Sequence, residues 1–488
     1  MSVTLPTTGQ QTDQTTHRLP RQQDRSALTR ALDTLAADLD GTLARPDDPT
    51  WDGARAAWNL AVDQSPTAVV IAETVRDVVS VVHVAREHGL RVAPQSTGHN
   101  AGPMGDLAGT ILLKTSAMRD VQIDPVARVA RAEGGAMWMD VTPAAAEHGL
   151  AALAGSAPDV GVSGYTLGGG MSWLARSHGL AANSVVAIEV VTADGVHRRV
   201  DESHEPELFW ALRGGGGSFG IVTAIEFRLY PVTEVYAGVL FFPLDRAAEV
   251  LEAWRQWLPS VPDSVTSVGR VLRFPPLPDL PPHLSGQSFV VVEAACQLPA
   301  DEAADLLAPL RALGPAMDTF DTIPMIGLSQ LHMDPPGPVP GKGDGALLGS
   351  LSAEAIESFA RVASAESSPL LSIELRHLGG ALTPGRMTGG AVSGIDAEFA
   401  LFAVGITPTP EAAEAVESAV VGVQHVMGPW TTGGVYLNFA ERPKTGKALF
   451  GSYGTYARLR AVKAEYDASD VIRSNHPVRP ATEADAGR

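Results

Sequence analysis

Three glycine-rich segments in the first half of the chain constrain its fold more than any other feature. They span residues 94–102, 161–170 and 213–220. Glycines at this density let backbone N–H groups approach an anion or a flat ring, because no Cβ atoms intervene. One such segment is often only a turn, but three within one half of the chain indicate a ligand that the backbone holds.

The three segments match neither of the two common nucleotide-binding loops. None ends in the Gly-Lys-Ser/Thr triplet of a Walker A loop, and no GxGxxG pattern follows the first predicted strand. A Rossmann-type NAD domain is therefore disfavoured.

Length and charge narrow the possible classes of protein. At 488 residues the chain exceeds the size at which one hydrophobic core usually stops growing, which predicts two domains. The formal net charge of −19 argues against nucleic acid or an anionic membrane as the main partner. No apolar stretch approaches the roughly 18 residues of a membrane span, and residues 1–25 indicate a disordered tail without the apolar region of a signal peptide. We expect a cytoplasmic protein.

The chain has a single cysteine, Cys296. This excludes an intrachain disulfide and a cysteine-based zinc site, and we predict no metal site. Because Cys296 follows the apolar run 289–295, we expect a buried, inert thiol.

Hydrophobic periodicity predicts mixed helices and strands before residue 231. Strands at 68–71 and 90–93 flank a helix at 75–88, and this unit leads directly into the glycine-rich turn 96–102. The other predicted elements of this part are helices at 24–39 and 137–148, strands at 110–113, 121–123, 129–132, 184–191 and 220–229, and a hairpin at 190–196.

The pattern changes near Pro231, beyond which antiparallel-looking strands predict a second domain. The predicted elements are strands at 235–242, 267–272, 289–295, 371–378 and 400–406, helices at 247–257, 302–313 and 411–426, and Pro-rich or Pro/Gly loops at 275–282 and 334–345. A strand at 435–439 and a helix at 456–466 are expected at the end of the chain.

Linked motifs in a fixed order carry a resemblance to a known family. They are the segments 94–102, 161–170 with 178–183, 208–217, the Tyr-x-Asn motif at 436–439, and the terminal residues Arg458, Lys463, Tyr466 and 475–477. From about residue 51 to 480 the chain resembles the berberine-bridge-enzyme-like branch of the vanillyl-alcohol-oxidase/PCMH superfamily.

The resemblance implies an α+β fold with a two-part, PCMH-type FAD-binding domain and a substrate domain whose antiparallel sheet is covered by helices. The expected boundaries are a disordered tail at 1–26, the FAD-binding domain at 27–233, the substrate domain at 234–432, and a C-terminal segment at 433–488 that returns to the FAD-binding domain.

The same resemblance implies that His99 bonds the C8α methyl of FAD. The chain has Gln-Ser-Thr-Gly at 95–98, where relatives have Arg-x-Gly-Gly. Ala157 stands where many relatives bond FAD through a cysteine, so no cysteinyl bond is expected. Val160 falls at the gate beside the flavin, where a small residue is associated with oxygen access and favours an oxidase. The implied cofactor contacts are His99, Ser96, Thr97, Gly98, Asn100, Gly102, Val160, Gly161, Gly164, Tyr165, Gly168, Gly169, Gly170, Asn183, Gly220, Ile221, Val222, Tyr436 and Asn438.

Two residues are candidate catalytic groups. By the resemblance, Tyr436 takes the hydroxyl proton as hydride leaves, and Phe439 replaces a second tyrosine found in many relatives. Glu374 lies in the alternating run 372–377; if it points into the pocket, apolar surroundings would raise its pKa and suit it to act as a base. A shifted register would leave Glu374 solvated, and since Arg376 shares its face, a simple ion pair is also open.

The implied function is an oxidase that transfers hydride from a small-molecule alcohol C–H, in secondary metabolism, to flavin N5, after which O2 reoxidises the flavin and yields H2O2. The alternatives are oxidative cyclisation or C–C bond formation, sugar or amine oxidation, and a binding protein whose flavin site has decayed. The expected partners are the substrate and O2, and the expected state is a monomer or homodimer.

Overall fold

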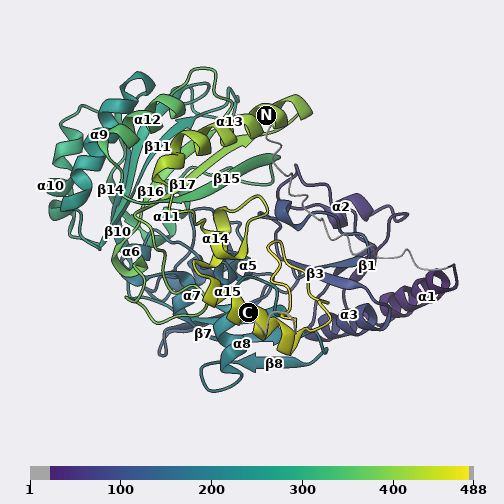
Figure 1. Cartoon of the computed structure of the whole chain (residues 1–488). Coiled ribbons are helices and arrows are strands. Elements are labelled where there is room, and N and C mark those ends of the chain that lie inside the picture. Colours follow the sequence, from purple (N-terminus) through teal and green to yellow (C-terminus); the bar gives the residue numbers. More distant parts are fainter. Residues whose placement is uncertain (1–21, 483–488) are drawn as a thin grey trace, which may run out of the picture.

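In the computed structural model, which describes residues 22–482, the N-terminal part of the chain forms a four-stranded sheet (Figure 1). The sheet order is β1-β2-β4-β3, and β2, β4 and β3 run parallel. Helix α3 (Val75–Glu87) connects β2 to β3 and packs an apolar face on the sheet. The strands are β1 (Thr42–Ala44), β2 (Ala68–Ile71), β3 (Arg91–Gln95) and β4 (Thr110–Lys114). Because β3 ends at Gln95, the turn 96–102 lies at the carboxyl edge of this sheet.

A five-stranded antiparallel sheet with the order β5-β6-β9-β7-β8 follows. Its strands are β5 (Val121–Asp124), β6 (Val129–Glu133), β7 (Val185–Val191), β8 (His197–Val200) and β9 (Ile221–Arg228). Trp138 at the start of α4 (Trp138–Ala146) and Phe209 in α8 (Pro206–Leu212) belong to the core beside this sheet. The predicted hairpin at 190–196 is the connection between β7 and β8.

The third sheet is antiparallel and larger, with the order β13-β10-β12-β11-β16-β17-β15, and β14 also pairs with β10. Helices α9, α12 and α13 lie over its outer face (Figure 1). The strands are β10 (Glu234–Pro243), β11 (Val265–Arg273), β12 (Ser288–Cys296), β13 (Met317–Asp318), β14 (Asp321–Pro324), β15 (Gly341–Leu348), β16 (Ser372–His377) and β17 (Phe399–Ile406). The helices of this part are α9 (Ala247–Trp257), α10 (Ala300–Arg311), α11 (Leu328–Leu331), α12 (Ala353–Ala363) and α13 (Pro410–Met427).

Alternation along the central strands gives the large sheet two different faces. Val271 and Ile373 belong to the apolar core beneath the helices. Arg270 and Glu374, which pair across β11 and β16, point to the opposite side, toward the first half of the chain. This inner face therefore carries charged side chains at the centre of the molecule.

The end of the chain returns to the N-terminal sheet. Ile472 forms a β-bridge with Val92 in β3. The ammonium group of Lys463, in α15 (Tyr453–Tyr466), is fully buried and donates to the carbonyls of Ser218 and Ile472, each at 2.8 Å, and to Asp467 at 2.6 Å. Because a buried charge is costly unless it is fully paired, these contacts fix the C-terminal segment against the first half of the chain.

The α+β class is confirmed, and most of the predicted elements have counterparts within a few residues. Helix α1 (Gln22–Asp38) begins inside the predicted tail 1–26, of which residues 1–21 lie outside the described part of the chain. Cys296 ends β12 in the core, and burial raises the pKa of its thiol to about 12, as expected of an inert group. None of the described helices is long and apolar enough to span a membrane.

Two predicted segments differ from the structure. The loop predicted at 334–345 gives way at Gly341 to β15, because pairing with β17 overrides the low strand propensity of its glycines. The strand predicted at 435–439 is wrong: the Tyr-x-Asn residues form a 3₁₀ turn, η7 (Leu437–Phe439), closed by local backbone bonds such as Phe439 N–H to the Tyr436 carbonyl at 2.9 Å. Helix α12 was not predicted at all.

Candidate cofactor and active site

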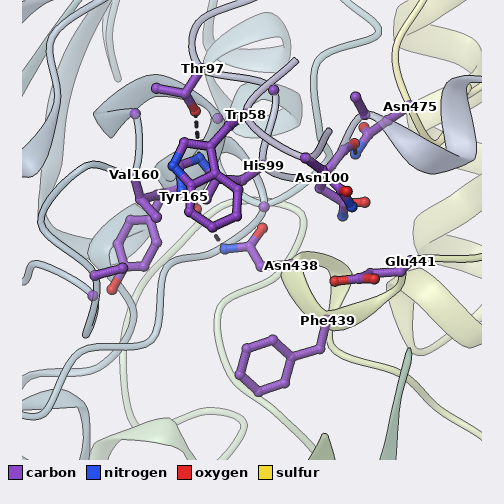
Figure 2. Close-up of a pocket in the computed structure, with 18 of the residues that line it drawn as sticks. Trp58, Thr97, His99, Asn100, Val160, Tyr165, Asn438, Phe439, Glu441 and Asn475 are labelled. Atoms are coloured by element: carbon purple, nitrogen blue, oxygen red, sulfur yellow. Dashed lines mark hydrogen bonds between the residues drawn. The ribbon is translucent and has the colours of Figure 1, made fainter. Parts of the chain in front are cut away.

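A cavity of about 430 Å³ lies between the glycine-rich turns and the inner face of the large sheet (Figure 2). Its size is typical of a small-molecule site, and the C-terminal segment completes its wall. The predicted site residues that line it are Ser96, Thr97, Gly98, His99, Asn100, Val160, Gly161, Gly164, Tyr165, Gly168, Gly220, Val222, Glu374, Tyr436 and Asn438. The fold thus gathers residues from separate motifs around one space, while their individual contacts with a cofactor stay predictions.

Three side chains hold His99 at the cavity wall, and Figure 2 shows two of them, Trp58 and Thr97. Its ring stacks on Trp58 with the centroids 4.0 Å apart and an interplanar angle of 18°. Nδ1 lies 2.8 Å from Thr97 Oγ1, and Nε2 lies 3.5 Å from Asp159 Oδ1. Asp159 Oδ2 accepts a hydrogen bond from Trp58 Nε1 at 2.5 Å. Burial alone would raise the pKa of Asp159, but the nearby His99 ring and the hydrogen bond from Trp58 lower it, so a charged carboxylate stands beside the imidazole.

Two glycines show why these turns exclude side chains. Gly98 has a φ of +89°, which favours glycine, and a Cβ there would lie 2.5 Å from Gln95 Nε2. Gly168, directly after the short helix α5 (Val162–Leu167), contacts the Tyr-x-Asn turn, and a Cβ there would lie 1.7 Å from Asn438 Oδ1. Glycine at 168 therefore allows the second segment and the C-terminal segment to meet at the cavity.

Tyr436 and Asn438 reach the cavity from the turn η7. Asn438 Nδ2 donates to Tyr436 Oη at 3.0 Å and to the Tyr165 carbonyl at 2.9 Å. Burial raises the pKa of the Tyr436 phenol above its ordinary value, while the bond from Asn438 and the charge of Arg376 act in the opposite direction. The Tyr165 ring lines the cavity, and its hydroxyl donates to the Leu153 carbonyl at 3.1 Å.

Glu374 points into the cavity, but its environment differs from the predicted one. Its side chain is 2% exposed; Oε1 accepts from Arg376 Nε at 2.6 Å and Oε2 lies 2.8 Å from His332 Nε2. Burial alone would raise the pKa of Glu374, but the charges of Arg376 and His332 hold it well below its ordinary value. The prediction of a raised pKa is wrong, because cations rather than apolar groups surround the carboxylate. The ion pair with Arg376 is the alternative that the structure shows.

His332 and Glu441 also line the cavity and were not among the predicted site residues. His332 directly follows α11. Burial alone would lower the pKa of His332, but the carboxylates of Glu293 and Glu374 raise it to about 8. Glu441 accepts a hydrogen bond from the Gly343 N–H at 2.6 Å, and burial raises its pKa to about 7. Both lie in loops without periodicity, and only the position of Glu441 close to the Tyr-x-Asn motif could have drawn attention to it.

Five predicted contacts lie outside the cavity wall: Gly102, Gly169, Gly170, Asn183 and Ile221. Gly170 makes room for Tyr165, since a Cβ there would lie 2.5 Å from the tyrosine ring. Asn183 uses its amide within the protein, donating to the carbonyls of Thr388 and Ser393, and thereby holds the loop after β16. The side chain of Ile221 points into the core because it alternates with its neighbours along β9.

Several polar atoms around the cavity are unpaired, and they indicate whether a flavin dinucleotide would fit there. Ser96 Oγ, Asn100 Oδ1 and Ser163 Oγ are buried at the cavity wall and have no hydrogen-bond partner among the described residues. Buried polar groups are nearly always paired in folded proteins, so these atoms are suited to a polar ligand. With glycine-rich backbone beside them and a fixed imidazole at the wall, the residues present fit FAD.

Comparisons with known proteins agree with this geometry. Residues 66–201 match the family model described as an FAD binding domain. The chain is 28% identical over 470 residues to (R)-6-hydroxynicotine oxidase of Paenarthrobacter nicotinovorans, which covers 91% of this chain and 97% of that protein. The solved structure of BBE-like 1 of Physcomitrella patens has a TM-score of 0.80 at 20% identity and covers 93% of this chain and 100% of that one. Glucooligosaccharide oxidase of Acremonium strictum has a TM-score of 0.77 at 23% identity, with 93% and 99% covered.

Proposed function

Because this chain belongs to the berberine-bridge-enzyme-like FAD-linked oxidoreductases of the vanillyl-alcohol-oxidase/PCMH superfamily, we propose that it oxidises a small-molecule alcohol in secondary metabolism. One observation carries this proposal: His99 and Tyr436, from opposite ends of the chain, line the same cavity. FAD, when bound, supplies the redox chemistry by accepting hydride at N5 and passing the electrons to O2, which yields H2O2.

Tyr436 is the proposed acceptor of the substrate hydroxyl proton. The hydrogen bond from Asn438 and the charge of Arg376 both favour the phenolate form of this side chain. Burial opposes the phenolate, so the loss of either neighbour should slow proton transfer. Val160, at the cavity wall, is the proposed small residue on the path of O2.

We propose that His99 forms a covalent bond to the flavin. The glucooligosaccharide oxidase named above carries a 6-S-cysteinyl, 8α-N1-histidyl FAD. In this chain Trp58 and Asp159 fix the imidazole plane, which favours attack by one ring nitrogen on a defined carbon. A second bond from a cysteine is not proposed, because Ala157 occupies the matching position and Cys296 is buried in the large sheet.

Amine oxidation is the second candidate. The similarity to (R)-6-hydroxynicotine oxidase extends over 97% of that protein, and its name describes the oxidation of a nicotine derivative. An amine that binds as the free base needs no hydroxyl proton acceptor, so Tyr436 would then contribute to orientation rather than to proton transfer. Replacement of Tyr436 by Phe therefore separates the two candidates.

The test begins with the visible spectrum of the purified protein. A yellow protein that bleaches anaerobically with one class in a panel of alcohols, sugars and amines, and that yields one H2O2 per product in air, would support the oxidase. A colourless, folded protein that takes up no FAD would refute the proposal. Product without peroxide would instead indicate a redox-neutral use of the flavin. Acid precipitation decides the linkage: flavin in the pellet, with a mass increase on the His99 peptide, supports the bond, and flavin wholly in the supernatant refutes it.

A further inference from the structure

Five ionisable side chains form one buried group on the inner face of the large sheet, which we call the charged cluster. Its members are Arg270, Glu293, His332, Glu374 and Arg376. Their side chains are between 0% and 13% exposed, and Arg376 is the most exposed of them. All except Glu293 line the cavity.

Hydrogen bonds within the charged cluster fix the orientation of Arg376. Its Nε donates to Glu374 at 2.6 Å, and its Nη2 lies 3.1 Å from His332 Nε2. Arg270 is anchored behind them, with Nη2 2.7 Å from Glu293 Oε1. Glu374 therefore holds the Nε edge of the Arg376 guanidinium, while Nη1 has no hydrogen-bond or ion-pair partner within residues 22–482.

The free edge of Arg376 belongs to the reactive part of the cavity. The guanidinium carbon lies 5.0 Å from the centroid of the Phe439 ring. Arg376, Tyr436 and Tyr165 all line this cavity, and the charge of Arg376 acts on both phenols. Phe439 also stacks on Phe402, with ring centroids 4.6 Å apart, so a flat apolar surface adjoins the cation.

An arginine with one edge fixed and the other free is well suited to bind a carboxylate, because its planar donors match the two oxygens. A purely structural ion-pair network gains little stability over apolar packing, so stability alone is a weak reason for five ionisable groups here. Asp334, in the same loop as His332, is the further carboxylate facing the cluster, and its Oδ2 already accepts from Ser156 Oγ at 2.7 Å.

We propose that Arg376 is a substrate-binding residue, and that the enzyme selects flat substrates carrying a carboxylate, which Arg376 binds while Phe402 and Phe439 pack on the ring. This inference rests on the proposed oxidase function and names its substrate class. The carboxylate would then anchor the substrate beside Tyr436, with its oxidised carbon held toward the cofactor side of the cavity.

Benzoate and benzamide test this directly, since they share a shape and differ in charge. Each is titrated into the oxidised holoenzyme, and the change in the flavin absorption spectrum gives its Kd. We expect benzoate to bind at least about tenfold more tightly than benzamide, as a charge-assisted hydrogen bond provides. In Arg376→Gln the two Kd values should become equal, and Arg376→Lys should keep part of the preference.

The matched control is Arg361→Gln, which removes an arginine that is 72% exposed on the outer helix α12. It should leave both Kd values unchanged. Glu374 keeps its contact with His332 in Arg376→Gln, and thermal unfolding with flavin content checks that this variant is folded. Should it fail to fold, the benzoate preference of the wild type and its reduction in Arg376→Lys decide the question.

Equal binding of benzoate and benzamide to the wild type, or unchanged benzoate binding in Arg376→Gln, would overturn the inference without touching the oxidase proposal. Conversely, a holoenzyme that prefers benzoate through Arg376 but is reduced by no alcohol or amine would refute the proposed function and support the anion site.

Discussion

Replacement of Glu374 by Gln distinguishes a structural carboxylate from a catalytic base. The amide keeps the size of the side chain but removes the charge that faces Arg376 at 2.6 Å and His332 at 2.8 Å. Both cations are at least 87% buried, since their side chains are 13% and 4% exposed. Breaking a buried pair by removing one partner costs about 3–5 kcal/mol, because the other charge stays uncompensated. We expect the free energy of unfolding to fall by that amount.

Urea unfolding of the holoenzyme, followed by tryptophan fluorescence, measures this loss near neutral pH. The pKa of Glu374 is lowered in the folded protein, so its contribution is present above about 4.5, the ordinary value of the carboxyl, and is lost as the pH falls below it. The difference between wild type and Glu374→Gln should therefore shrink on acidification. The double variant Glu374→Gln/Arg376→Gln is the control, and it should regain part of the loss because an uncompensated cation is gone.

The opposite pattern would refute this reasoning. If Glu374→Gln unfolds at the same urea concentration as the wild type and yet loses turnover by two orders of magnitude or more, in the range typical of a lost general base, Glu374 is the base after all. In that case the charged cluster would be able to hold an unpaired, buried cation without a loss of stability, which conflicts with the cost expected from its burial.

Three further substitutions test other parts of the site. Tyr436→Phe should lower kcat for an alcohol about 100-fold or more with flavin content unchanged, as stopped-flow flavin reduction would show; an unchanged rate would exclude Tyr436 as the proton acceptor. Asp159→Asn should reduce the acid-stable fraction of flavin while total FAD is retained, and equal acid-stable flavin would mean that Asp159 does not position His99. The pKa of Glu441 is raised to about 7, so the wild type loses stability as the pH rises from about 4.5 through 7. At alkaline pH the free energy of unfolding of Glu441→Gln should therefore exceed that of the wild type by up to about 3 kcal/mol. Urea midpoints of the two proteins that change in parallel across this pH range would contradict this.

Much of the fold could be predicted because local patterns agreed with the final structure. The apolar periodicity of α3 and the short apolar run of β2 need no tertiary information, and the glycine turn at 96–102 follows β3 as expected. The segment at 341–348 could not be predicted in this way. Its glycines have low strand propensity, and only pairing with β17 makes it a strand.

Only those site residues that stand in recognisable sequence motifs could be predicted. His99 and Tyr436 stand in recognisable sequence patterns and do line the cavity. The environment of Glu374 was not predictable, because it depends on His332, a loop residue 42 positions away that no periodicity connects to it. The same holds for Trp58, which stacks on His99 although it lies far outside the glycine-rich segments.

The return of the chain end to the first sheet sets an order of events during biosynthesis. Arg91, at the start of β3, forms an ion pair with Asp470, a residue translated 379 positions later. Tyr436 and Asn438, which close the cavity opposite the first glycine turn, also emerge late from the ribosome. A ribosome-bound chain still lacking these residues has an open half-site, so the complete cavity forms only in the nearly finished or released polypeptide.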